Sequence, residues 1–123
     1  MLKEEKLKTD IIDYFGKLIK VANLNSNETL VTLPLWMADG DGVAFYIITD
    51  DKNNCRLTDD GDLINVHCSP NPKVKEKIKD LLIRNGFEVD DKYIISYNAN
   101  KSDLVSSINY FANTMIQMSY LEE

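Results

Sequence analysis

Five aspartates are the residues whose type and spacing suggest chemistry in this chain. They fall in two short segments that also contain glycine, and they are Asp39, Asp41, Asp59, Asp60 and Asp62. Clustered carboxylates bind hard divalent cations or a basic surface on another protein. The spacing lacks the twelve-residue pattern of a calcium-binding hand loop. A basic protein partner and a divalent cation therefore both stay open, with the protein partner preferred.

Turn chemistry is the simplest explanation for the same aspartates. Tight turns use aspartate because its side chain bonds to nearby backbone, and glycine because it adopts positive φ angles. Asp62 also precedes a short apolar segment and could cap a helix there. This explanation accounts for most of the five without any ligand.

The other reactive residues form no catalytic set. His67, the single histidine, stands beside Cys68, but adjacent side chains point in different directions, so a Cys–His dyad is not expected. The sequence has no glycine-rich phosphate loop, serine nucleophile motif or zinc signature, so we expect no cofactor and favour a non-enzymatic role. Cys55 and Cys68 do not make a disulfide framework and are expected to be free thiols in a reducing compartment.

Composition narrows the range of partners. The net charge of −6 and the pI near 4.7 argue against direct nucleic-acid binding and against docking on anionic lipid. No apolar run approaches the ~18 residues of a membrane span. Lysine far outnumbers arginine, as AT-rich coding produces, which suggests a low-GC bacterium or its phage. We therefore expect a cytoplasmic protein of a bacterium or an infected bacterial cell.

Hydrophobic periodicity predicts an α+β fold in one domain spanning residues 1–123, with helices packed on one face of an antiparallel sheet. A helix is expected first, then a three-stranded meander, a short helix, a longer helix, one or two strands and a last helix. The expected helices are 2–22, 62–68, 72–86 and 101–121, and the expected strands are 28–36, 43–50, 55–58, 87–89 and 93–97.

Local signals fix several boundaries. Pro34 cannot donate to a strand ladder, so its strand should lie at an edge or end nearby. Asn71 and Pro72 predict a helix start, Gly86 a left-handed helix end, and Asn100 a further cap. The strand at 43–50 is apolar on both faces, which favours a central place in the sheet.

The meander also predicts where the aspartates lie. The turn before its second strand and the turn after its third strand meet at the same end of the sheet, which gathers all five candidate residues there. Asp50 and Asp51 fall at the opposite end. Each close pair of solvated carboxylates would repel by roughly 1 kcal/mol or less.

Several segments resemble a known family. These are Leu33-Pro34, the segment from Asp41 to Ile48, and Leu57-Thr58-Asp59-Asp60-Gly61 followed by Leu63-Ile64. They are similar to the bacterial and phage-encoded proteins called domain of unknown function 1828. The resemblance implies the same α+β element order and occurrence in bacteria and prophages, and it supplies no activity and no catalytic residues.

The sequence therefore predicts a protein-interaction module that binds a partner with a basic surface through the acidic sheet end. An inhibitor of a nucleic-acid-handling defence enzyme is one specific form. A metal-dependent phosphoryl-transfer enzyme that uses the clustered aspartates is one alternative, and a small chaperone or structural subunit is another. A homodimer also stays open, through the face that carries Phe111, Met115 and Met118 if the domain leaves that face uncovered.

Overall fold

The computed structural model describes residues 1–50, 52 and 54–122. Its core is a six-stranded antiparallel sheet in the order β1-β2-β3-β4-β6-β5. The strands are β1 (Lys20–Asn23), β2 (Glu28–Trp36), β3 (Gly42–Thr49), β4 (Asn54–Thr58), β5 (Glu88–Val89) and β6 (Ile95–Asn100). The helices are α1 (Glu4–Leu18), α2 (Pro72–Arg84) and α3 (Leu104–Ser119), with single turns η1 (Leu63–His67) and η2 (Lys101–Asp103). The predicted α+β class is confirmed.

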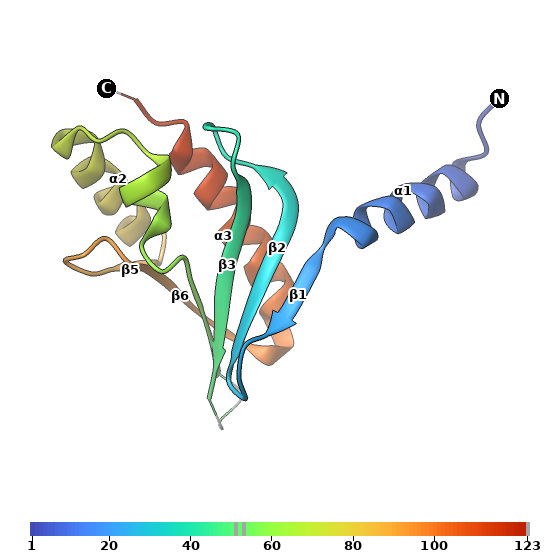
Figure 1. Cartoon of the computed structure of the whole chain (residues 1–123), viewed down its shortest axis with the longest axis horizontal. Helices are drawn as coiled ribbons and strands as arrows, with labels where there is room; N and C mark the ends of the chain where they lie inside the picture. The colour runs from blue at the N-terminus through green and yellow to red at the C-terminus, as the bar shows by residue number, and fades with distance from the viewer. Residues whose placement is uncertain (51, 53, 123) are drawn as a thin grey trace.

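One face of the sheet and two helices enclose the hydrophobic core. Alternate residues of β3, including Phe45, point into it, because successive side chains of a strand face opposite sides. α2 contributes Ile78 and α3 contributes Phe111, whose ring centroid lies 5.2 Å from that of Phe45. Figure 1 shows α3 packed along the sheet and α2 beside it.

Several predicted boundaries are confirmed. The Asn71 side chain accepts the Lys73 N–H at the start of α2, with Pro72 at the first position. Gly86 follows that helix with φ of 90°. Asn100 and Asp103 form a capping box before α3. Strand β3 is central, with two strands on one side and three on the other.

The predicted helix over 2–22 is wrong in its last turn. α1 ends at Leu18, and the chain then forms β1, which pairs with β2 from Lys20↔Thr32 to Asn23↔Thr29. The apolar residues Ile19 and Val21 fit a helical stripe as well as a strand, so periodicity could not separate the two. Backbone hydrogen bonds to β2 make this segment a strand, and the periodicity of the segment itself does not reveal them.

The expectation that all helices pack on one face is also wrong for α1. This helix contains no buried residue, and it extends away from the sheet (Figure 1). Its chain direction is set by β1, which leads it off the sheet edge. Among the helices of the described residues, α2 and α3 therefore cover the core face, together with Leu63 and Ile64 of η1.

Pro34 lies in a strand that is second from the edge rather than at the edge. Its position nevertheless obeys the physical rule, because β1 pairs only with Thr29–Thr32 of β2 and leaves the segment after Thr32 unpaired on that side. The β2–β3 register also shifts between Leu33 and Trp36. Proline is tolerated there because no ladder needs its missing N–H.

None of the helices in the described part of the chain has the length and apolar character that a membrane crossing requires.

Candidate functional site

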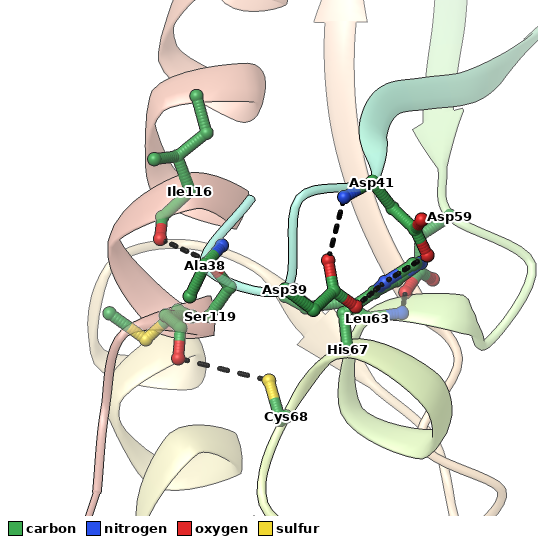
Figure 2. Close-up of polar contacts among 10 residues, drawn as sticks. Ala38, Asp39, Asp41, Asp59, Leu63, His67, Cys68, Ile116 and Ser119 are labelled. Carbon is green, nitrogen blue, oxygen red and sulfur yellow. Dashed lines mark hydrogen bonds and ion pairs between the residues drawn. The ribbon is translucent and has the colours of Figure 1, made fainter. Parts of the chain in front are cut away.

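The candidate site is the end of the sheet where β3 begins and β4 ends. β3 and β4 pair antiparallel, with Tyr46 opposite Thr58, so the turn before β3 and the turn after β4 lie at the same end. Asp39 and Asp41 come from the first turn, and Asp59, Asp60 and Asp62 from the second. The close-up in Figure 2 shows Asp39, Asp41 and Asp59 from these two turns near one another.

The first turn is held rigidly by its own backbone and by α3. Met37 N–H donates to the Asp41 carbonyl at 2.9 Å, and Gly40 N–H donates to the Met37 carbonyl at 2.9 Å. Ala38 N–H donates to Ser119 Oγ at 2.9 Å, which ties the turn to the end of α3. The buried Met37 side chain anchors the same turn in the core. Asp39 and Asp41 therefore occupy fixed positions.

His67 lies against these two carboxylates. Its Nδ1 atom is 2.6 Å from Asp39 Oδ2 and 3.4 Å from Asp41 Oδ2. The three side chains each offer one ligand atom, and these atoms lie within 4.8 Å of one another. Two carboxylate oxygens and an imidazole nitrogen suit a divalent transition metal such as zinc or manganese. Without a metal, the same arrangement is an ion pair when His67 is protonated.

Asp39 is the more strongly held of the two carboxylates. Its Oδ1 accepts the Asp41 N–H at 3.0 Å. This backbone bond, followed by the bond to the His67 ring, holds the pKa of Asp39 below its ordinary value. Hydrogen bonds to the charged form explain the direction, and Asp39 is therefore ionised at neutral pH.

Asp59 has a different role from its neighbours. It is 1% exposed, and its carboxylate accepts three backbone N–H groups. Gly61 and Ile95 donate to Oδ1 at 3.0 Å each, and Leu63 donates to Oδ2 at 2.8 Å. Burial raises the pKa of Asp59, and the three hydrogen bonds oppose that rise in part.

Asp59 thus joins β4, η1 and β6, and it is not accessible to a partner. It also caps η1, whereas the side chain of Asp62, which the sequence suggested as that cap, makes no capping bond. The accessible acidic set consists of the exposed residues Asp39, Asp41, Asp60 and Asp62. We call these four residues the acidic end.

No lysine or arginine neutralises the acidic end among the described residues. The ion pairs found there are those of His67, and the one lysine–aspartate pair of the described chain, Lys6 with Asp10, lies on α1. Asp60 adopts φ of 56°, a left-handed conformation that aspartate tolerates better than most residues. The acidic end therefore presents four carboxylates on fixed turns.

Asp50, expected at the opposite end, organises its own turn there. Its Oδ1 accepts the N–H groups of Lys52 and Asn54, at 2.8 and 3.1 Å. Asp51, which was predicted beside it, lies outside the described residues.

Cys68 does not form a dyad with His67. Its thiol points toward the Met118 carbonyl at 3.7 Å, and burial, followed by the charges of Asp59 and Asp39, raises its pKa to about 11. A thiol with that pKa stays protonated at neutral pH and is a poor nucleophile. Cys55 is buried, and both cysteines are free.

Sequence reasoning did not connect His67 with the aspartates. The available signal was its position five residues after Asp62 on a short helix, which returns it to the same end of the sheet.

Comparison with known proteins finds one family. The model described as "Domain of unknown function DUF1828" matches residues 33–118. The match covers both turns of the acidic end and starts within β2, after α1 and β1. No curated protein and no solved structure matches the chain significantly.

Proposed function

Since the chain belongs to the DUF1828 family, whose description carries no activity, we propose a function from its geometry: a non-enzymatic protein-interaction module. The acidic end is the docking surface, and the partner is a protein with a basic surface. The observation that carries this proposal is a set of four exposed carboxylates on fixed turns that lack lysine or arginine counterions among the described residues.

Fixed carboxylates favour such binding for two reasons. Little side-chain and loop entropy is lost on docking when the turns are already ordered. Complementary charge also speeds the encounter of the partners and suppresses partners of like charge. The acidic end therefore favours a basic protein surface over nucleic acid or an anionic membrane.

The proposal extends to a biological setting. A protein with a net charge of −6 can occupy the basic channel of an enzyme that handles nucleic acid. An inhibitor of a host defence nuclease, encoded by a phage or another mobile element, is the specific form we favour. The two free cysteines fit a reducing cytoplasm.

The test is affinity capture from a low-GC bacterial lysate with matched variants. One variant carries Asp39→Asn, Asp41→Asn, Asp60→Asn and Asp62→Asn, and it leaves the buried Asp59 intact. The control removes four charges elsewhere through Glu4→Gln, Glu5→Gln, Asp80→Asn and Glu88→Gln, which are all exposed. Both variants are first shown to melt as the wild type does.

We expect a partner that the wild type and the control retain and the acidic-end variant loses. Binding of the purified partner should weaken steeply with salt, because exposed charges are screened within about 8 Å at physiological ionic strength. Equal capture by all three proteins, or capture that salt does not affect, would rule out the acidic end as the docking surface.

A divalent-metal site is a second candidate function, favoured by the three ligand atoms of Asp39, Asp41 and His67. A metal-dependent phosphoryl-transfer enzyme would have to use this site. Asp59 would not be one of its metal ligands, because its carboxylate already accepts backbone N–H groups. Zinc or manganese should raise the melting temperature of the wild type and of Asp60→Asn, but not of His67→Gln. An unchanged melting temperature of the wild type with zinc, manganese and magnesium would remove this candidate.

A further inference from the structure

The N-terminal arm, which we define as α1 and Ile19, is attached to the sheet through β1 and packs no side chain into the core of the described chain. α1 contains no buried residue, and all four residues of β1 are exposed. Its apolar side chains nevertheless recur at helical spacing and form one stripe. Between 39% and 59% of each side chain is exposed at Leu7, Ile11, Ile12, Phe15, Leu18 and Ile19. A 15-residue helix in water is marginal on its own, so this stripe needs a covering surface.

The arm is poorly placed to cover this stripe with its own domain. Only Ile19 separates the end of α1 from the start of β1, and its backbone is extended, with φ of −77° and ψ of 128°. Reversal of a helix onto a neighbouring sheet ordinarily takes a loop of about two to six residues. The helix therefore runs on from the strand and away from the body, as Figure 1 shows.

The sheet has an apolar strip that also lacks a cover. α2 and α3 occupy one face. On the other face β2 and β3 present the half-buried Leu30, Tyr46 and Ile48 and the exposed Ala44, with Glu28 opposite Ile48 and Thr32 opposite Ala44 at the two ends. The solvent face of an antiparallel sheet is ordinarily polar. β4 and β6 follow that rule on this face with Arg56, Asn98 and Asn100. The apolar strip is therefore confined to two strands.

The arm is wide enough and long enough to cover the strip. Two strands span about 10 Å across, which is the width of one helix with its side chains. The strip residues of β3, from Ala44 to Ile48, extend over about 14 Å, and the 15 residues of α1 over about 22 Å. One helix of this length can therefore cover the strip.

We propose that the arm of each copy lies across the helix-free face of β2 and β3 in a second copy of this chain. One chain carries one arm and one strip, so a reciprocal two-fold pair covers both. A short connection that prevents closure on the same chain favours such exchange. This proposal concerns a different surface from the acidic end and does not depend on it.

The buried area is sufficient for a stable dimer. About 300 Å² on each strip and a similar area on each arm would total about 1,200 Å² for the pair, the lower end of specific, stable interfaces. The alternative face with Phe111 and Met115 is already buried in the core of one chain and cannot serve.

The first test is sedimentation equilibrium of the full chain, in which we expect a dimer. Phe15→Asp should raise the dimer dissociation constant at least ~100-fold, because it places an unpaired charge in an apolar contact twice per dimer. The residue is 44% exposed in the single chain, so folding of that chain should be unaffected. Thr9→Asp, which adds the same charge on the other side of α1, should leave the dissociation constant within about threefold.

The second test identifies the surface that receives the arm. Ala44→Glu changes an exposed residue on the helix-free face and should also produce monomers. A mixture of the Phe15→Asp and Ala44→Glu proteins should form a heterodimer, because one copy keeps its arm and the other keeps its strip. Monomeric wild type up to about 100 μM would overturn the proposal, since a specific interface of about 1,200 Å² should bind more tightly than that. A dimer that survives Ala44→Glu, or variants that do not complement each other, would also overturn it.

Discussion

α1 and α3 have similar lengths and similar apolar spacing, yet their environments are opposite. α3 buries Phe111, Ala112 and Met115 against the sheet, whereas α1 buries no side chain. α3 follows β6 through η2 and packs back on the core face, while α1 continues from an edge strand. An amphipathic pattern thus indicates that a helix needs a covering surface, and the connection to its neighbour decides whether its own chain supplies one.

Deletion of one aromatic ring from each helix tests this comparison with the largest expected effect. Phe111→Ala should lower the free energy of unfolding by about 3–5 kcal/mol, because it leaves a cavity beside Phe45. Phe15→Ala should change it by about 0.5 kcal/mol or less in a dilute, monomeric sample. Urea denaturation measures both. A loss near 2 kcal/mol for Phe15→Ala under these conditions would mean that α1 belongs to the body of the fold.

A buried carboxylate in the body of the fold and an exposed carboxylate on α1 allow the same comparison for polar groups. Asp59→Ala should cost on the order of 3 kcal/mol, because three buried N–H groups lose their acceptor. Asp13→Ala, at an exposed position on α1, should stay within about 0.5 kcal/mol. Thermal and urea unfolding of both variants provide the check. Equal effects would show that Asp59 is not the link between β4, η1 and β6.

The raised pKa of Asp59 predicts a pH dependence for the body of the fold. The folded state binds this proton more tightly than the unfolded state, so the contribution of Asp59 to stability falls as the pH rises from its ordinary value of 3.8 through the folded pKa. The unfolding free energy of the wild type minus that of Asp59→Asn should therefore decrease as the pH rises from 3 to 7. A difference that favours the wild type more as the pH rises would contradict the assigned direction.

The ion pair on the arm should have the smallest effect. Lys6 Nζ lies 3.1 Å from Asp10 Oδ2, with both side chains largely exposed. Lys6→Ala should change the stability of the monomer by less than about 0.5 kcal/mol, because solvent screens the pair. A larger loss in urea denaturation would mean that α1 is coupled to the body.

Much of the fold could be predicted from the sequence where local chemistry fixes it. Asn71 with Pro72, Gly86, and Asn100 with Asp103 mark helix boundaries that the structure confirms. The change from helix to strand at Ile19 could not be predicted, because the apolar spacing there continues the helical stripe as well as it fits a strand. Pairing with β2, across the short turn between Asn23 and Glu28, decides it.

The candidate site was predicted in its location but not in its internal roles. Meander topology follows from short turns, so the aspartates could be assigned to one end of the sheet. Burial separates Asp59 from Asp60 and Asp62, although all three stand in one turn. Likewise, the contact of His67 with Asp39 joins residues 28 positions apart.

The sequence by itself determined the α+β class, most of the strands and helices, and the acidic turns, because each depends on the preferences of neighbouring residues. Only the tertiary structure decided which carboxylate is buried, which nitrogen of the His67 ring lies against Asp39, and which amphipathic helix is left uncovered. These outcomes depend on backbone N–H groups and surfaces that come together from distant parts of the chain.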